Sequence, residues 1–353
     1  MSLASARHAF ASFMAWEAVT SLGESAAETA LLLRAGLSNV CASRFVDGAG
    51  ERVRMCAAPA VPLEIGGLDR AAALASLALG RLAEAIDVKR QAVLLLALPD
   101  SYGAADAAFA RSPHGRSFLD TVRRSLKRAA SLDIEIFPFG RAAGAVALRR
   151  AVEFVDQDRL VIWGGVDTMY DWTVLETLER DDRLLTAENV DGVRPGEGAA
   201  FVALGPSATR GIHVVGIGAG REPSPVGSGK PCRSLGLTAA LDAAVAPLRD
   251  AGRRSNCWLL DTSHEAYATQ ELQNVIARFG DVLGLEAELH MPLKELGDAG
   301  AAAMPLLAVL GAEAWRLGYA NDDTAVITGC SKDGARGALL LAADSFHRTE
   351  MAA

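Results

Sequence analysis

The residues best placed for chemistry lie at the start of an apolar segment, residues 141–155. This segment has the length of a helix, and Ala142, Ala145 and Leu148 are examples of the small or apolar residues on every side of it. Such a helix is typical of a protein interior, and because its charged residues fall in the second half, its start should be the deeper end. A helix start offers unpaired N–H groups and a partial positive charge, which favour an anion or a nucleophilic thiolate. The sequence therefore predicts either a buried functional position there or a packing helix without chemistry.

The cysteines form no recognisable reactive or metal-binding pattern. The sequence contains neither a Cys-x-x-Cys pair nor a Cys/His spacing typical of a metal site, so we expect no metal and no other cofactor. An odd, scattered set of thiols favours a reduced cytoplasmic protein, and residues 1–8 lack the pattern of a signal peptide. The five cysteines are Cys41, Cys56, Cys232, Cys257 and Cys330.

The composition of the 353-residue chain is that of a globular protein, because 50% of its residues are hydrophobic and 22% are charged. A net charge of −8 argues against nucleic acid or an anionic membrane surface as the main partner. The longest apolar runs, such as residues 92–98, are far too short to span a bilayer. We therefore expect neither a nucleic-acid partner nor membrane insertion.

Strand and helix patterns alternate along the chain, and each half contains one helix that is apolar nearly all round, at residues 141–155 and 301–315. A short linker at residues 205–211 separates the halves. This near-duplication predicts two packed α/β halves, residues 1–205 and 206–353, around two buried central helices. Further strands are predicted at residues 92–98, 160–163, 212–217, 257–260 and 325–328, further helices at 68–85, 235–251 and 267–279, a hairpin at 44–55 and a loop at 293–300.

Several motifs resemble those of β-ketoacyl synthases (3-oxoacyl-ACP synthases) of the thiolase superfamily. Residues 191–199, Asp-Gly-Val-Arg-Pro-Gly-Glu-Gly-Ala, are similar to their Asp-Gly-Phe-x-x-Gly-Glu-Gly-Ala segment. Residues 294–302 resemble their Lys-x-x-x-Gly-His-x-x-Ala-Ala motif. Weaker matches at residues 18–23, 164–167 and 329–337 fall in the expected order along the chain. The resemblance implies an α/β thiolase-like fold of five layers, α-β-α-β-α, with two pseudo-duplicated halves, usually as a dimer.

The resemblance also locates the positions of the family's active site, and their residues have changed. Synthases place a nucleophilic cysteine at the start of the first buried helix and use two histidines to bind and decarboxylate the thioester. This alignment puts Arg141 at the cysteine position and Asp298 at one histidine position. His264 lies near the other histidine position, and Lys294 matches the family's lysine. Because a guanidinium stays protonated, it cannot attack a thioester, and we expect these four residues to mark a vestigial site.

A charged Arg141 at a buried helix start needs a partner, since burying the charge alone is costly and the helix end there is already positive. The implied fold brings the loop of Asp298 close to this helix start. We therefore predict an ion pair between Arg141 and Asp298, with Asp167 as the rival partner.

The loss of the nucleophile favours a non-catalytic protein, a pseudoenzyme that acts by protein binding. The resemblance offers two precedents: chain-length-factor subunits, which pair with an active synthase, and thiolase-like adaptors or chaperones found beside bacterial type VI secretion effectors. The expected partners are therefore a second copy, another thiolase-fold protein, an acyl carrier protein or a secretion effector or adaptor.

Two alternatives remain open from the sequence. The first is an acyltransferase of the 3-oxoacyl-[acyl-carrier-protein] synthase type that uses His264, Lys294 and Asp298 on acyl thioesters. In that case Cys330, in a glycine-rich loop, is the best substitute nucleophile, although a small buried residue at a strand end is the simpler interpretation. The second alternative is a ligand-binding pseudoenzyme in which Arg141 holds a carboxylate or phosphate.

Overall fold

A computed structural model describes residues 9–87, 89–102, 106–126, 129–157, 159–206, 211–262 and 264–344. Ten strands form one continuous sheet in the order β10-β9-β11-β12-β8-β1-β7-β6-β4-β5. Its two halves meet where β1 (Ala11–Thr20) pairs antiparallel with β8 (Ile212–Arg221), through Ala11 with Val214 and Ser12 with His213. This junction is short, so the packing of helices between the halves must supply much of their mutual support.

The two halves of the sheet repeat one topology. In each half, three neighbouring strands run parallel, and the two strands nearest the junction run antiparallel to their neighbours. Since β7 ends at Gly205 and β8 begins at Ile212, we propose that the division between residues 205 and 206 separates the two halves. The remaining strands are β4 (Gln91–Ala97), β5 (Ser131–Phe137), β6 (Leu160–Thr168) and β7 (Glu197–Gly205) in the first half, and β9 (Ser255–Leu259), β10 (Leu283–His290), β11 (Thr324–Cys330) and β12 (Ala335–Ala343) in the second.

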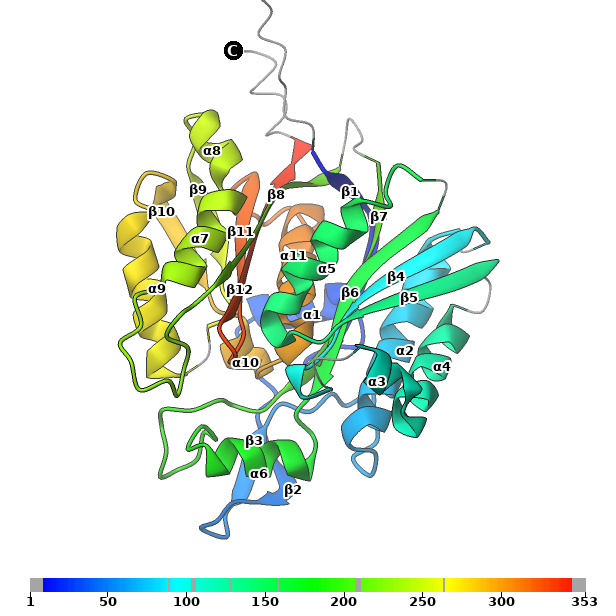
Figure 1. The fold of residues 1–353 in the computed structure, drawn as a ribbon, viewed down its shortest axis with the longest axis vertical. Helices are drawn as coiled ribbons and strands as arrows, with labels where there is room; N and C mark the ends of the chain where they lie inside the picture. The colour runs from blue at the N-terminus through cyan, green and yellow to red at the C-terminus, as the bar shows by residue number, and fades with distance from the viewer. Residues whose placement is uncertain are drawn as a thin grey trace, which may run out of the picture.

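Helices complete five layers, α-β-α-β-α, as the sequence predicts (Figure 1). The central layer holds α5 (Ala143–Val152) and α11 (Ala303–Arg316), which contact strands of both halves. The outer layers are α2 (Gly67–Ala85) with α4 (Pro113–Ser125) on the first half, and α7 (Leu235–Ala244) with α9 (Ala266–Arg278) on the second. The remaining helices are α1 (Ala26–Arg34), α3 (Asp106–Arg111), α6 (Trp172–Arg180), α8 (Ala246–Asp250) and α10 (Leu293–Leu296), with 3-10 turns η1 (Asp100–Tyr102), η2 (Gly140–Ala142) and η3 (Gly300–Ala302).

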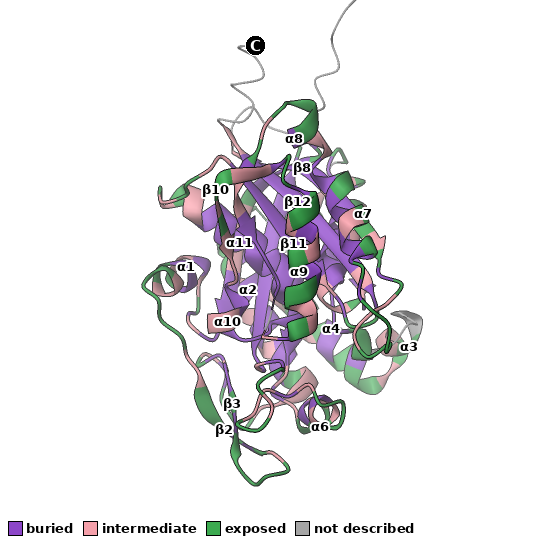
Figure 2. Cartoon of the chain, turned by 90° about the vertical axis from the view of Figure 1, so that its left-hand side faces the viewer, coloured by how far each residue is buried: buried purple, intermediate pink, exposed green. Residues whose placement is uncertain are grey.

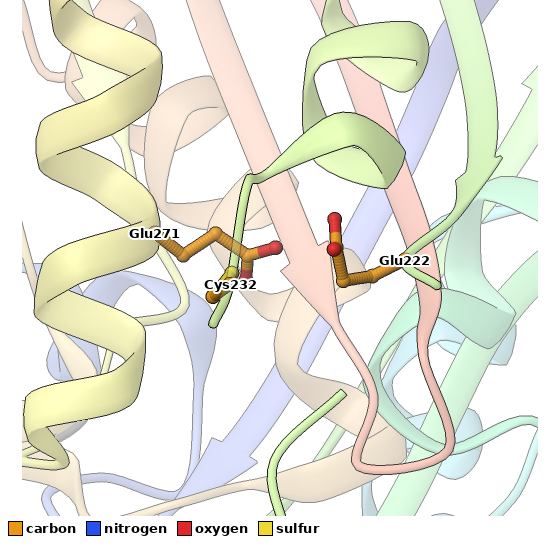
Figure 3. Close-up of side chains that lie close together, drawn as sticks. All are labelled: Glu222, Cys232 and Glu271. Atoms are coloured by element: carbon orange, nitrogen blue, oxygen red, sulfur yellow. The ribbon is translucent and has the colours of Figure 1, made fainter. Parts of the chain in front are cut away.

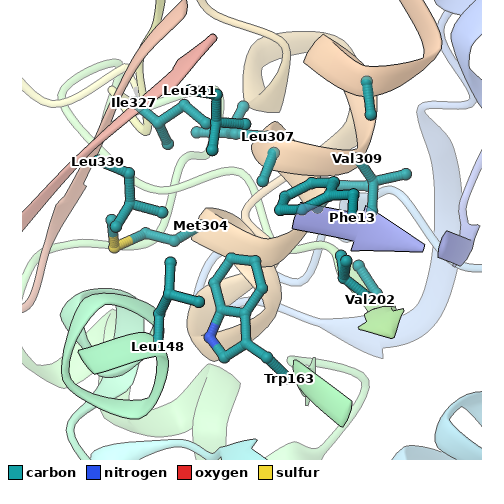
Figure 4. Packing of buried hydrophobic residues seen from close by; sticks show 14 of the residues in the cluster. Phe13, Leu148, Trp163, Val202, Met304, Leu307, Val309, Ile327, Leu339 and Leu341 are labelled. Atoms are coloured by element: carbon teal, nitrogen blue, oxygen red, sulfur yellow. The ribbon is translucent and has the colours of Figure 1, made fainter. Parts of the chain in front are cut away.

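Apolar side chains fill the space around the two central helices (Figure 4). The helices approach closely where Gly144 of α5 faces Met304 of α11, because a Cβ at Gly144 would lie 2.7 Å from the Cβ of Met304. Trp163 of β6 is fully buried there and donates from Nε1 to the carbonyl of Gly144 at 2.9 Å. Figure 2 shows the resulting contrast, with buried strands and a buried α11 behind the partly exposed α9 and α1. None of the helices in the described ranges is long and apolar enough to cross a bilayer.

A small lobe lies apart from the layers, at the lower end of Figure 1. It consists of the hairpin β2 (Cys41–Val46) and β3 (Arg52–Met55), which the sequence predicts, together with α6. Phe45, Met55, Tyr170 and Leu175 belong to its own apolar cluster.

Three sequence predictions need correction, and two strands were missed. The helix predicted at residues 141–155 begins as the 3-10 turn η2 and ends at Val152, and the helix predicted at 235–251 is divided into α7 and α8 before Pro247, whose ring cannot continue a helix. The loop predicted at 293–300 contains the short helix α10 and the turn η3. Strands β5 and β10 were not predicted; both are edge strands of the sheet.

Candidate functional site

The starts of the two central helices meet at the centre of the molecule. Each start is a 3-10 turn, η2 or η3, and the two turns are in contact. The first residue of each turn is a glycine with positive φ, 62° at Gly140 and 48° at Gly300, where other residues are strained. These matching turns aim both helix starts at one point, which we call the central site: Arg141, Asp167, Asp298 and Ser331.

Arg141 and Asp298 form the predicted ion pair. Arg141 Nε donates to Asp298 Oδ1 at 3.0 Å, and Arg141 Nη2 donates to Asp298 Oδ2. The side chains are only 12% and 3% exposed. Burial opposes the charged form of Arg141, but the neighbouring carboxylate of Asp298 outweighs it and raises the guanidinium pKa above its ordinary value. Asp298 Oδ1 also accepts the N–H of Gly300 at 2.9 Å, so the pair links η2 directly to η3.

The rival carboxylate, Asp167, has a different role. Its Oδ2 accepts the N–H of Ala301 at 2.8 Å, which caps the second central helix. A Cβ at Gly300 would lie 1.8 Å from the same oxygen, so this contact requires glycine. Burial, assisted by the charges of Asp298 and Asp100 and opposed by the hydrogen bond from Ala301, raises the pKa of Asp167 to about 7.

The start of the first central helix is already occupied by protein groups. Ser331 Oγ accepts the N–H of Ala142 at 2.8 Å and donates to the carbonyl of Phe139 at 2.5 Å. Its loop packs closely, because a Cβ at Gly329 would lie 2.7 Å from the carbonyl oxygen of Arg141. The N–H group that would stabilise a thiolate or an oxyanion is therefore satisfied by a hydroxyl.

His264 and Lys294 are close enough for the charge of Lys294 to act on His264, but neither belongs to the network of Arg141, Asp167, Asp298 and Ser331. His264 Nε2 is buried without a hydrogen-bond partner, and burial lowers the histidine pKa, assisted by the charges of Arg194 and Lys294. Among the described residues, no hydrogen bond joins either side chain to the Arg141–Asp298 pair, and Lys294 makes no ion pair. Of the four residues expected at the site, the structure thus brings two into contact, and the equivalence of all four to a synthase active site stays a prediction.

Cys330 is poorly suited to act as a nucleophile. The residue is half-buried, and burial raises the pKa of the Cys330 thiol well above its ordinary value, with Asp261 and Glu271 adding to the effect. Asp261 Oδ2 accepts the N–H of Cys330 at 2.6 Å and Oδ1 accepts from Thr328 Oγ1 at 2.9 Å. A nucleophilic cysteine needs an electropositive setting that favours the thiolate, whereas here burial and the carboxylates of Asp261 and Glu271 outweigh the charges of Arg336 and Arg141.

The central site has little free space. The cavity that touches Arg141 is also lined by Asp261, Cys330 and Glu271, and its volume is about 20 Å³. A single water needs roughly 10–15 Å³ measured in the same way. In the part of the chain that the structure describes, this cavity has no room for a pantetheine arm, a carboxylate ligand or a phosphate.

A buried acidic cluster lies next to this cavity, between α9 and the loop before α7 (Figure 3). The ligand atoms of Glu222, Cys232 and Glu271 lie within 4.8 Å of one another. Arg336 Nε, however, donates to both oxygens of Glu271, at 2.9 and 3.1 Å, and Glu222 Oε2 accepts the N–H of Gly236 at 2.9 Å. Since both carboxylates already have hydrogen-bond partners, we interpret the cluster as structural and assign no metal to it.

Sequence reasoning missed the role of the glutamate in the best-matching motif. Glu197 is fully buried and pairs with Arg70 of α2, whose Nε and Nη2 donate to its two oxygens at 2.7 Å. Glu197 also accepts the N–H of Ala58 and the hydroxyl of Thr168, both at 2.5 Å. A charged residue at the head of an apolar strand was the available signal, but the partner lies 127 positions away.

Comparison with known proteins places the fold. No protein-family model and no curated protein matches the sequence. Among solved structures, the ishigamide ketosynthase/chain length factor matches with a TM-score of 0.66 and 19% identity, covering 94% of this chain and 99% of that chain. A ketosynthase in complex with its chain length factor from Xenorhabdus doucetiae matches with a TM-score of 0.73 and 14% identity, covering 97% and 100%.

A ketosynthase from module 6 of the bacillaene synthase of Bacillus subtilis 168 gives a TM-score of 0.71 at 11% identity, covering 94% of this chain and 72% of that chain. At sequence identities this low, the similarity supports a shared fold and says nothing about activity. The chain therefore has the α/β, thiolase-like fold of ketosynthases and chain length factors, in a divergent form.

Proposed function

We propose that this protein is a non-catalytic, ketosynthase-like subunit that acts by binding another thiolase-fold protein. The observation that carries the proposal is the central site itself. A synthase needs a thiolate at the helix start, donors for an oxyanion and space for the acyl chain. Here Arg141 is paired with Asp298, Ser331 caps the helix start, and the remaining cavity measures about 20 Å³.

Two further observations support a protein partner of this kind. One similar solved structure is a ketosynthase in complex with its chain length factor, which is a two-protein assembly. In this chain, β5 is an edge strand whose backbone groups face outward along one side, and such an edge can pair with a strand of a second chain. Because β5 leads directly into η2, a partner on this edge would lie next to the central site.

Two measurements distinguish acyl transfer by this chain from binding to a partner protein. First, the purified chain is incubated with acyl-coenzyme A and acyl-loaded carrier protein, with an active synthase in parallel, and intact masses are recorded. We expect an acyl adduct on the synthase and none on this chain. An adduct mapped to Cys330 or another residue of this chain would refute the proposal in favour of a relocated nucleophile.

Second, light scattering after size exclusion gives the oligomeric state of the chain alone and mixed with a ketosynthase encoded by the same organism. We expect a two-chain assembly that Ile134→Pro in β5 weakens, because proline removes an N–H and cannot pair within a sheet. Leu285→Pro is the control, because it tests the strand at the opposite edge of the sheet, β10. Ile217 lies inside the sheet, so Ile217→Pro is unsuitable for this purpose. Equal weakening by both edge variants would argue against β5 as the interface.

A secretion effector or adaptor is the other class of partner that the sequence predicts, and an acyl carrier protein a third. No contact or charge in the described residues favours the effector over a synthase. Mass spectrometry of proteins that co-purify with the native chain distinguishes these partners, and capture of an effector without any thiolase-fold protein would replace the proposal above.

A further inference from the structure

A second, much larger cavity opens at the other end of α11, away from the central site. Its volume is about 380 Å³, within the roughly 300–1,000 Å³ of small-molecule pockets. It lies between α1, α11, β9, β10 and the turn after α11, and it shares no lining residue with the cavity at Arg141. The side chains that fill the central site therefore do not occupy this second cavity.

The inner wall of the cavity is apolar. Leu259 and Leu310 are 6% and 5% exposed and line it together with Trp315. Cys257 also contributes to the wall, and burial raises its pKa to about 12, so the thiol stays neutral and behaves as a small apolar group. An apolar part of a ligand would lose contact with water on entering this space.

One residue in this wall is unexpected for a packed helix. Gly311 lies in the interior of α11, where glycine costs about 1 kcal/mol relative to alanine. A Cβ there would approach only a methyl group of Leu259, at 3.2 Å, and Ala325 Cβ, at 3.8 Å. Backbone packing therefore does not require this glycine, and its effect is to keep the cavity open.

The charged groups at the mouth are mixed, because Arg34 lies there together with His290, Glu288 and Asp322. Arg34, at the end of α1, lies over the ring of Tyr319, 4.3 Å from its centroid, and forms no ion pair with any described residue. His290 Nε2 lies 3.2 Å from Glu288 Oε2, so this carboxylate already has a neighbouring polar group. Asp322 is occupied, because its carboxylate accepts the N–H groups of Asn256 and Thr324.

We propose that this cavity binds a small amphipathic carboxylate, with its aliphatic or aromatic part against Leu259, Leu310 and Trp315 and its carboxylate on the guanidinium of Arg34. Arginine presents paired N–H donors that match a carboxylate, and the contact with the ring of Tyr319 holds the Arg34 guanidinium beside the cavity. This inference does not depend on the partner role proposed above.

The test is isothermal titration calorimetry of the full chain with octanoate and with 1-octanol, which share a tail and differ in the head group. We expect octanoate to bind the wild-type chain about tenfold more tightly than octanol, since a charge-assisted hydrogen bond adds about 1.4 kcal/mol or more. Arg34→Gln should weaken octanoate by about tenfold and leave octanol unchanged. Arg123→Gln, in an exposed surface pair with Asp120, is the matched control and should change neither affinity.

Filling the cavity tests its location. Gly311→Leu should abolish binding of both ligands, with the fold checked by circular dichroism, because the new side chain points toward Leu259. Ala320→Trp at the exposed mouth is a second filling variant that leaves α11 unchanged, and it should weaken both ligands if Gly311→Leu does not fold. No binding of octanoate to the wild type, equal binding of the two ligands, or binding unaffected by both filling variants would overturn the proposal.

Discussion

Replacing Asp298 by asparagine tests how much the negative charge of the central ion pair contributes to stability. The amide keeps the shape of the side chain and an oxygen that can accept the N–H of Gly300. Arg141, only 12% exposed, would then be a buried charge without its hydrogen-bonded carboxylate, and a guanidinium cannot escape this state by losing its proton. Breaking a buried pair from one side costs about 3–5 kcal/mol. We expect Asp298→Asn to lower the free energy of unfolding by this amount.

Urea unfolding followed by circular dichroism measures the change, and two further variants control it. Asp133→Asn removes a carboxylate that is 68% exposed and pairs with Arg159, so its effect should stay within about 1 kcal/mol. Arg141→Gln combined with Asp298→Asn should be less destabilised than Asp298→Asn alone, because no unpaired charge remains. A loss for Asp298→Asn no larger than that of Asp133→Asn would refute the structural role of the pair.

Three further predictions concern other buried groups. Because the pKa of Asp167 is raised from 3.8 to about 7, its unfolded carboxyl ionises near pH 4 while the folded one stays protonated, so the free energy of unfolding should fall as pH rises from about 4 to 7. Urea unfolding across this range should show a smaller fall in Asp167→Asn, and parallel curves would contradict the assignment. Glu197→Gln should cost about 3–5 kcal/mol in the same assay by leaving the fully buried Arg70 unpaired, and a loss below 1 kcal/mol would count against this. Native iodoacetamide labelling, read by peptide mass, should modify exposed Cys41 and spare Cys330, so equal labelling would show an accessible thiolate.

The two α/β halves and their buried central helices could be predicted because their cause is visible in local sequence, whereas the five layers were implied by the family resemblance. Two helices that are apolar nearly all round must be buried, and a layer between the two halves of the sheet buries a helix on every side. Edge strands give a weaker signal. In β5, Leu132, Ile134 and Ile136 alternate with acidic residues, which is the pattern of a half-buried strand. The pattern was present but lay between a predicted helix and a proline, and its apolar positions are few.

The central site could be predicted only in part, for a physical reason. The Arg141–Asp298 pair follows from electrostatics, because a buried cation requires an anion and the implied fold offered few. Ser331 could not be found in this way, since a neutral hydroxyl carries no charge that demands a partner. The link between Arg70 and Glu197 was hidden for another reason: which of many charged residues is buried depends on the whole packing of α2 on the sheet.

The Arg141–Asp298 pair now has a structural effect that does not depend on catalysis. The sheet halves share only a short junction between β1 and β8, whereas Arg141 belongs to the first half and Asp298 to the second. An apolar pair of similar volume could be equally stable, but it would not fix one geometry as a two-bond ion pair does. By holding η2 against η3, the pair fixes how the two central helices meet, and through them how the halves present their outer edges. A protein that works by binding a partner needs such a fixed surface, and it does not need the space that a substrate would occupy.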